Sequence, residues 1–303
     1  MRRLKILNFG SLNLDYVYEV DHFVQPGETL SAASQTMKAG GKGLNQSIAL
    51  RRAGAEVWHA GCMGTGGKML VERLQKDGVH TEYIRPVPTL QGNAMIQVNA
   101  QGENCILLFG GSNQCVTEAQ IDETISAFAP GDWLLLQNEV NLVGMMWDKA
   151  TEKGLMIALN PSPFDRKLDA VDYGKLSWLL MNEIEAEQLT GETDPAAAWT
   201  LLHQQYPRLS VLFTLGVKGS MAWRVQQGMI ETHSEPALPV QAVDTTAAGD
   251  TYTGYFISGL MEGLPLQICM ERAARASAIA VTRPGAADSI PDKNEVDAGG
   301  NIR

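Results

Sequence analysis

The 303-residue chain contains 45% hydrophobic and 19% charged residues, which is typical of a folded globular protein. Its net charge of −10 argues against nucleic-acid binding by bulk attraction, although local amides and one or two cations can still hold a phosphate. The four cysteines are widely spaced, so we expect free thiols rather than a zinc site or a disulfide framework. The N-terminal apolar run is too short for a signal peptide, and no apolar run reaches membrane-spanning length. We therefore expect a cytoplasmic protein without membrane contacts.

Short apolar, β-branched runs alternate with amphipathic segments along most of the chain. The runs expected to form strands are 4–9, 57–62, 133–136, 155–159, 178–181 and 211–215. The segments expected to form helices are 43–52, 69–76, 118–127, 143–153, 184–189 and 196–206, followed by 248–262 and 266–281. A strand-then-helix rhythm is typical of parallel strands joined by crossover helices. The pattern therefore predicts a layered α/β fold.

Two stretches without helical patterns break this rhythm. Residues 15–37 are extended and contain the turn signal Pro26-Gly27, and the strand-like runs 94–99 and 104–108 flank a four-residue hairpin turn. Together they predict a small antiparallel sheet, inserted at about 13–38 and 92–110, that projects from the main domain. A projecting sheet beside a ligand site is suited to act as a lid, and its exposed face is suited to form a homodimer.

The strongest chemical signal is the run AVDTTAAGDT at 242–251, in which an extended approach gives way to small residues and then to a helix. Small residues let a ligand approach the backbone, and free N–H groups at a helix start favour anions. Asp250 lies where a substrate hydroxyl could meet a phosphate held by those amides and lose its proton to the carboxylate. A lone aspartate at such a position is more often a helix cap, but the whole run reverses that preference.

A second glycine-rich run, AGGKGLNQ at 39–46, leads into a helix, with Lys42 and Asn45 as hydrogen-bond donors. It is not a Walker A loop, because Gly43 follows Lys42, where the pattern needs serine or threonine. Either this run or the stretch 61–68 could simply be a tight strand-to-helix turn, and we prefer that interpretation for 61–68. Residues 214–219 either flank a nucleotide or form a hairpin turn.

Polar residues also follow several predicted strands, where ligands of parallel α/β sheets gather. They are Asn13, Asp15, Glu139, Asn160, and Asn182 with Glu185. The last two lie three residues apart, a spacing that lets them share a helix face and hold a metal-bound water near phosphates. Each of these residues, taken alone, is more often a cap or a solvated surface residue.

These motifs resemble, in order and spacing and over nearly the full chain, the ribokinase branch of the PfkB carbohydrate kinase family. The segments that carry the resemblance are 40–46, NEIE at 182–185, 214–219, 242–251 and AVTRPGA at 280–286. The resemblance implies one domain over 1–303, a three-layer α/β/α arrangement with a mainly parallel central sheet, and a small β lid. It also implies an ATP-dependent kinase that phosphorylates the terminal hydroxymethyl of a pentose, D-ribose first.

The resemblance further implies a role for individual residues. Asp250 would be the catalytic base, beside an anion hole formed by Ala247, Ala248 and Gly249. The sugar would contact Asn13, Asp15, Gly41, Lys42, Asn45 and Glu139. The nucleotide would lie along Asn182, Thr214, Gly216, Gly219 and Gly249, with Glu185 holding Mg²⁺ through water. A K⁺ site would be formed by Asp244, Thr246, Ala280, Arg283, Gly285 and Ser289.

Three departures from the family pattern accompany this resemblance. The segment after Gly64 is about two residues shorter than in the family pattern. Leu44 replaces a small residue, and this substitution could narrow the sugar pocket. The last family helix is expected to be short or missing. None removes a catalytic group. The alternatives left open are a kinase for deoxyribose or a ketose, a nucleoside kinase, and a non-catalytic sugar or nucleotide sensor.

Overall fold

A nine-stranded sheet forms the centre of the computed structural model, which describes residues 2–299. Its strand order is β13-β12-β11-β10-β9-β8-β1-β4-β5. The strands are β1 (Lys5–Phe9), β4 (Glu56–Thr65), β5 (His80–Leu90), β8 (Trp133–Gln137), β9 (Met156–Asn160), β10 (Trp178–Asn182), β11 (Ser210–Thr214), β12 (Ser220–Gln226) and β13 (Met229–Glu235). The run from β11 to β5 is parallel, and β12 and β13 add an antiparallel hairpin at one edge. The predicted, mainly parallel sheet is confirmed.

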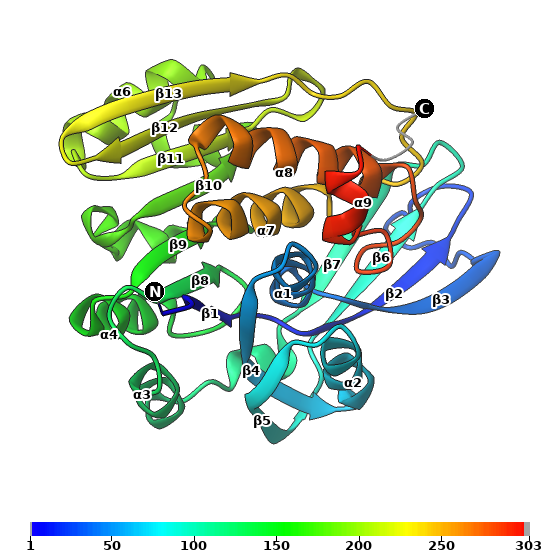
Figure 1. The fold of residues 1–303 in the computed structure, drawn as a ribbon. Helices are drawn as coiled ribbons and strands as arrows, with labels where there is room; N and C mark the ends of the chain where they lie inside the picture. Colours follow the sequence, from blue (N-terminus) through cyan, green and yellow to red (C-terminus); the bar gives the residue numbers. More distant parts are fainter. Residues whose placement is uncertain (1, 300–303) are drawn as a thin grey trace.

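Helices cover both faces of this sheet, which gives three layers (Figure 1). One face carries α1 (Lys42–Arg52), α2 (Lys68–Lys76), α7 (Ala248–Met261), α8 (Leu266–Val281) and the short α9 (Lys293–Asp297). The other carries α3 (Glu118–Ser126), α4 (Val143–Lys153), α5 (Glu183–Thr190) and α6 (Pro195–Gln205). Side chains of a strand alternate between two hydrophobic cores: Ile6 packs with α1 and α7, whereas Leu7 packs with α3 and α4.

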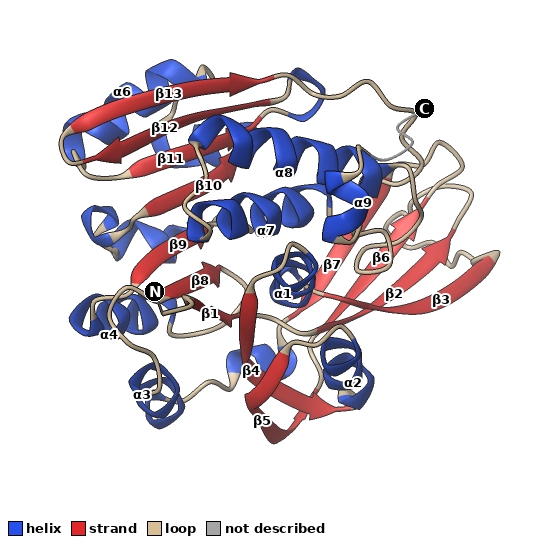
Figure 2. Ribbon diagram, viewed as in Figure 1, coloured by secondary structure: helices blue, strands red, loops and turns tan. Residues whose placement is uncertain are grey.

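A separate four-stranded sheet projects from one end of the molecule (Figure 2). Its order is β3 (Ser34–Gly40), β2 (Asn13–Glu19), β6 (Asn93–Val98) and β7 (Asn104–Phe109). The outer pairs are antiparallel, but β2 and β6 run parallel, because each enters this sheet from the main body in the same direction. The predicted small sheet is present and is mostly antiparallel, with one parallel pair, β2 with β6, at its centre.

The predicted helices are all present within one or two residues, whereas the strands at 80–90, 220–226 and 229–235 were not predicted. β5 contains Pro86 and Pro88 among polar residues, a composition that only an edge strand tolerates. The β12–β13 hairpin follows another strand without an intervening helix of more than one turn, so the strand-then-helix rhythm gives no signal for it. Within residues 2–299, no helix is both long and apolar enough to cross a membrane.

Candidate active site

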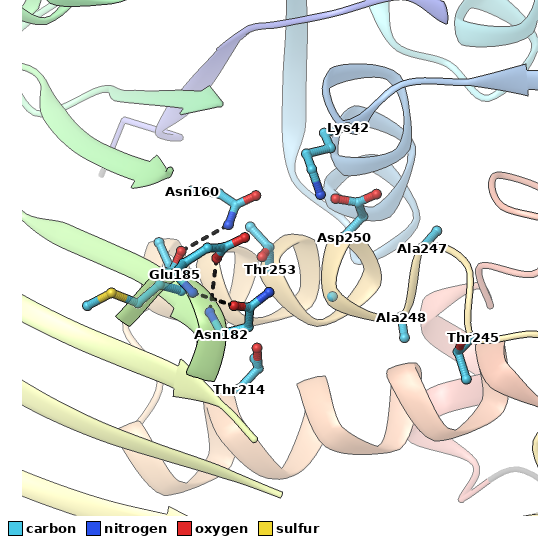
Figure 3. Close-up of a pocket in the computed structure, with 13 residues that line it drawn as sticks. Lys42, Asn160, Asn182, Glu185, Thr214, Thr245, Ala247, Ala248, Asp250 and Thr253 are labelled. Atoms are coloured by element: carbon cyan, nitrogen blue, oxygen red, sulfur yellow. Dashed lines mark hydrogen bonds between the residues drawn. The ribbon is translucent and has the colours of Figure 1, made fainter. Parts of the chain in front are cut away.

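A cavity of about 240 Å³ lies where the carboxyl ends of β9, β10 and β11 face the N-terminus of α7 (Figure 3). Parallel strands expose their last residues at one edge of the sheet, so Asn160, Asn182 and Thr214 reach the same cavity from successive strands. The remaining lining residues are Lys42, Leu180, Met181, Glu185, Thr245, Ala247, Ala248, Gly249, Asp250 and Thr253. Residues of the glycine-rich run 39–46 and of the small-residue run 242–251 thus share one space.

Asp250 lies in the first turn of α7 and is 8% exposed. Both of its carboxylate oxygens accept side-chain hydrogen bonds from α1: Asn45 Nδ2 donates to Oδ2 at 3.0 Å and Gln46 Nε2 donates to Oδ1 at 2.8 Å. Two donated hydrogen bonds, one to each oxygen, fix the plane of the carboxylate. Asp250 is therefore a fixed acceptor at the edge of the cavity, and its two side-chain partners lie on α1 rather than on its own helix.

The backbone at the start of α7 is shaped to receive an anion. Ala247 precedes the helix in the left-handed conformation, with φ of 60°, and Thr251 N donates to its carbonyl at 2.8 Å. The first amides of a helix have no partner within it, and the helix dipole adds positive potential there. Because Ala247, Ala248 and Gly249 line the cavity and carry at most a methyl group, an anion can approach these amides closely.

Lys42 brings a positive charge to the same cavity, its side chain directed toward Asp250 (Figure 3). Burial lowers the pKa of its ammonium group, but the carboxylates of Asp250, Glu139 and Glu185 outweigh that effect and hold the pKa above its usual value. The Lys42 backbone N–H donates to Glu139 Oε2 at 3.0 Å, and the Ser11 hydroxyl donates to the same oxygen. Lys42 is therefore charged and surrounded by carboxylates.

Two carboxylates beside Asp250 have raised pKa values. Burial, reinforced by the charges of Glu139 and Asp250, raises the pKa of Asp15 to about 7 despite the opposing charge of Lys38. Burial likewise raises the pKa of Glu139, and the Asp250 charge adds to that effect, although Lys42 and Ser11 oppose it. Like charges close together disfavour ionisation of one another. The cluster is thus suited to accept hydrogen bonds from a ligand with several hydroxyl groups.

The other predicted sugar-contacting residues lie beside this cluster. Asn13 is 5% exposed, and its Oδ1 accepts from Asn113 Nδ2 at 2.7 Å. Gly41 has φ of 93°, and a Cβ there would approach Ser11 Oγ to 3.1 Å. Asp15 lies opposite Lys38 in the β2–β3 pair, and a Cβ at Gly40 would overlap its carboxylate. The glycines of 40–43 therefore allow the small sheet and α1 to approach closely.

Asn182 and Glu185 form a reciprocal capping box at the start of α5. Glu185 N donates to Asn182 Oδ1 at 2.8 Å, and Asn182 N donates to Glu185 Oε2 at 3.0 Å. Both line the cavity together with Thr214, whereas Gly216 and Gly219 lie in the turn between β11 and β12, outside its lining. Within residues 2–299, no group of three or more His, Cys, Asp or Glu side chains forms a metal cluster. A divalent ion here would therefore need ligands from phosphates and water as well as Glu185.

The six residues of the predicted K⁺ site come from two segments that lie side by side. Asp244 joins them, because its Oδ1 accepts from Thr246 N at 2.8 Å and its Oδ2 accepts from Gly285 N at 2.8 Å. Burial raises the pKa of Asp244, but these hydrogen bonds and the charge of Lys38 more than offset it and hold the pKa below its usual value. Ala280 O accepts from Arg283 N at 3.0 Å, and Ser289 Oγ donates to Ala286 O at 2.8 Å.

The side chain of Arg283 forms an ion pair with Glu295, so only the backbone of Arg283 is free to serve that site.

Leu44 does not narrow the cavity. It is fully buried and packs in the core between α1 and the sheet, because its position on α1 faces away from Asp250. Sequence reasoning also gave no role to Gln46 and none to Ser11, Lys38 or Gln137. Gln46 was visible as part of a motif, but Gln137 is one polar residue at the end of an apolar strand and carries no distinctive signal.

The fold and the cavity together define a layered α/β protein in which a buried aspartate faces a helix N-terminus, with lysine and carboxylates beside it. Residues 3–293 match the family described as "pfkB family carbohydrate kinase", and the chain belongs to this family. It is 35% identical to the ribokinase of Haemophilus influenzae, over 94% of this chain and 95% of that one. It is 30% identical to the deoxyribokinase of Salmonella typhimurium, over 95% and 96%.

Among solved structures, the chain is similar to the ribokinase of Arabidopsis thaliana complexed with ribose and ATP. The TM-score is 0.85 at 28% identity, with 98% of each chain covered.

Proposed function

We propose that the protein is an ATP-dependent sugar kinase that phosphorylates the terminal hydroxymethyl group of a pentose, D-ribose first. The observation that carries this proposal is the buried Asp250 carboxylate, held by Asn45 and Gln46 beside the first amides of α7. This arrangement places an acceptor for a hydroxyl proton next to a cradle for a phosphoryl group. The family membership and the similarity to a structure with ribose and ATP support the same reaction.

In the proposed reaction, Asp250 accepts the proton of the sugar hydroxyl as that oxygen attacks the γ-phosphorus of ATP, and the bond to the β-phosphate oxygen breaks. The backbone amides of Ala248 and Gly249, following Ala247, stabilise the charge on the transferring group, with Lys42 adding a positive charge beside them. A positioned base typically contributes about 10²–10⁴-fold to such a reaction. In this proposal Asp250 is the base, and the first amides of α7 stabilise the negative charge on the transferring phosphoryl group.

The sugar-contacting residues in this proposal are Asn13, Asp15, Gly41, Lys42, Asn45 and Glu139. Asp15 and Glu139 accept hydrogen bonds from hydroxyl groups, whereas Asn45 and Lys42 donate. Because Asp15 and Asn13 belong to the small sheet, this sheet closes over the sugar as a lid. We propose that the lid segments, about 13–38 and 92–110, are insertions in one domain over 1–303.

The proposed nucleotide contacts are Asn182, Thr214, Gly216, Gly219 and Gly249. The buried Glu185 carboxylate fits a water-mediated contact to Mg²⁺, which supplies charge neutralisation on the phosphates when bound. The proposed K⁺ ligands are backbone carbonyls of segments 244–246 and 280–289. Asp244 holds these two segments together by accepting hydrogen bonds from Thr246 N and Gly285 N. Such an ion orders the loop that precedes α7.

We further propose that the protein is a cytoplasmic homodimer joined through the small sheet. All six residues of β7 are exposed, including Ile106, Leu107, Leu108 and Phe109, and Met37 and Met95 of this sheet are exposed as well. Side chains alternate along a strand, so Leu107 and Phe109 share one side of the small sheet with Met95 and Met37, whereas Ile106 and Leu108 lie on the other side. The apolar face that contains Leu107 is costly in water, and a second copy of the same face would cover it.

Deoxyribose is the second candidate substrate, because a deoxyribokinase is among the relatives at 30% identity. A coupled assay of ADP release with ribose, deoxyribose, a ketose and adenosine tests both. We expect ribose to give the highest kcat/KM and adenosine none. ADP release with deoxyribose alone would transfer the proposal to that sugar, and no release with any acceptor would leave only a sensor function.

A further inference from the structure

A buried chain of side-chain amides continues from Asp250 into the core, beyond the residues that line the cavity. Gln46 Oε1 accepts from Gln137 Nε2 at 2.7 Å, and Gln137 Nε2 also donates to Asn8 Oδ1 at 2.9 Å. Asn8 Nδ2 donates to the Ser47 hydroxyl at 2.8 Å, and this hydroxyl is hydrogen-bonded to His59 Nδ1 at 2.8 Å. All five of these residues are fully buried. We refer to Gln46, Gln137, Asn8, Ser47 and His59 as the amide chain.

A backbone carbonyl at one end fixes the direction of the hydrogen bonds among Asn8, Gln137 and Gln46. Asn8 Nδ2 lies 2.8 Å from Gly43 O, and because a carbonyl oxygen only accepts, the NH₂ group of Asn8 must face it. Asn8 therefore turns its oxygen toward Gln137, which must present its NH₂ group. Gln137 then needs an acceptor on Gln46, so the NH₂ group of Gln46 is left to face Asp250.

A second carbonyl fixes Gln46 from the opposite side. Asn160 Nδ2 donates to Leu180 O at 3.0 Å, which turns Asn160 Oδ1 toward Gln46 Nε2 at 3.3 Å. The two hydrogens of Gln46 thus have two acceptors, Asp250 Oδ1 and Asn160 Oδ1. Reversing the Gln46 amide would place its oxygen against a carboxylate and a carbonyl oxygen, and would place its NH₂ group against that of Gln137. The hydrogen bonds on the Gln137 side and those on the Asn160 side both exclude that reversal.

The neutral state of the far end suits this direction. Burial lowers the pKa of His59 to about 3, although the Gly10 backbone opposes the shift, so the imidazole is uncharged at neutral pH. Gln137 leaves its own Oε1 without a hydrogen-bond partner within residues 2–299, while both of its hydrogens are used. A buried unpaired acceptor costs free energy, so the two donated bonds decide how Gln137 is oriented.

We infer that Gln137 is a positioning residue, which acts through Gln46 to hold the Asp250 carboxylate in the plane required for proton transfer, with Asn8 as its anchor. This inference rests on the proposed role of Asp250 as base. Gln137 does not line the cavity. Its effect is therefore on turnover rather than on sugar affinity, since a small misplacement of reacting groups costs rate.

A double-mutant cycle with Gln46→Met and Gln137→Met tests the inference, because methionine preserves the side-chain length but removes the donors. Each single variant is expected to lower kcat about tenfold or more while KM for the sugar changes less than about threefold. The double variant is expected to be no slower than Gln46→Met, since Gln137 acts through Gln46. Multiplicative losses, or a rise of KM as large as the fall of kcat, would overturn it.

Gln120→Met is the matched control, because Gln120 is another buried amide with two donated bonds, to Gly61 O and Tyr83 O, remote from Asp250. Its Tm should fall as much as that of Gln137→Met while kcat stays within about twofold of the parent. Equal losses of kcat in Gln120→Met and Gln137→Met would show that Gln137 contributes only to stability and would overturn the inference. If Gln137→Met does not fold, Asn8→Leu removes the anchor and should lower kcat in the same sense; an unchanged kcat would overturn the inference.

A crystal structure of Gln137→Met separates this inference from the proposed reaction, because it needs no activity. Gln46 Nε2 should move out of hydrogen-bond distance of Asp250 Oδ1. If that bond remains, the inference fails even where the wild-type enzyme phosphorylates ribose. If the wild-type protein phosphorylates no sugar, but the bond from Gln46 Nε2 to Asp250 Oδ1 is lost in Gln137→Met, the proposed reaction fails and the positioning of Asp250 by Gln137 stands.

Discussion

Gly254 of α7 lies against Ala49 of α1 so closely that a Cβ added to Gly254 would approach Ala49 Cβ to 2.4 Å. One helical turn earlier on each helix are Asp250 and Asn45, which are hydrogen-bonded to each other. The same close contact of the two helices therefore brings the proposed base to its amide partners. The catalytic geometry depends on a glycine that touches no substrate.

Gly254→Ala should consequently impair turnover as well as stability. The added methyl group must push α1 and α7 apart, which costs about 1–3 kcal/mol of overpacking and separates Asp250 from Asn45 and Gln46. We expect kcat to fall about tenfold or more. Gly259→Ala on the same helix is the control, because its methyl group would meet Cys269 of α8 instead. Steady-state kinetics and thermal unfolding of both variants check this; equal kinetic effects would contradict it.

Asp15 should make stability depend on pH. Its pKa is about 7 in the folded protein against 3.8 in the unfolded chain, so between these values the folded state binds more protons. The free energy of unfolding therefore decreases as pH rises from about 4 to about 7, and the lost stability stays lost above pH 7. Asp15→Asn should flatten that decline.

Unfolding curves at pH 5 and pH 8 measure the effect, with Asp122→Asn as a control for an exposed carboxylate. Wild type and the control should lose more stability between the two pH values than Asp15→Asn does. Parallel losses in all three proteins would show that the carboxyl group of Asp15 is not the source.

Lys38 should reduce the need for a monovalent cation. An ideal Cβ on Gly285 would lie 3.8 Å from Lys38 Nζ, and the charge of Lys38 lowers the pKa of both Asp244 and Asp15. The loop proposed to bind K⁺ therefore already has a positive charge beside it. In Lys38→Met, the ratio of rates in K⁺ and Li⁺ should rise about threefold or more, since the ion then supplies more of the local potential.

Lys76→Met provides the comparison. Lys38 and Lys76 both line a second cavity, of about 330 Å³, but Lys76 belongs to α2. Its ratio of rates should equal that of the wild type. A ratio unchanged by Lys38→Met would show that Lys38 does not compensate for the ion. Rates indifferent to monovalent ions in every variant would remove the K⁺ site itself.

Leu107→Lys should dissociate the proposed dimer. Leu107 is 69% exposed on β7, in the middle of the apolar face, and a charge buried there on association has no partner. Size-exclusion chromatography with light scattering should show a dimer for wild type and a monomer for the variant. Val217→Lys, at an apolar residue 95% exposed outside the small sheet, should remain dimeric. A monomeric wild type would refute the interface.

The sequence was sufficient to predict the layered fold, because hydrophobic periodicity separated strands from helices at most positions. It was also sufficient to single out Asp250 and Lys42 as candidate site residues, because the small residues and glycines around them have few structural explanations. The structure brings both residues to one cavity. The sequence could not reveal Gln137 or Lys38, since their roles depend on which strands and helices become neighbours. Leu44 shows the converse: it differs from the family motif, yet its side chain enters the core, where the difference does not reach the cavity.

Asp250→Asn in the coupled assay, with the preferred pentose, tests the central proposal most directly. The amide keeps the size and one oxygen that can accept from Gln46 Nε2, but it cannot accept the hydroxyl proton, so kcat should fall about 10²–10⁴-fold while KM for the sugar stays within about threefold. Asp122→Asn, at an exposed aspartate of α3, should leave both constants unchanged. An Asp250→Asn enzyme that keeps more than about a tenth of the wild-type kcat would contradict the assignment of Asp250 as the base.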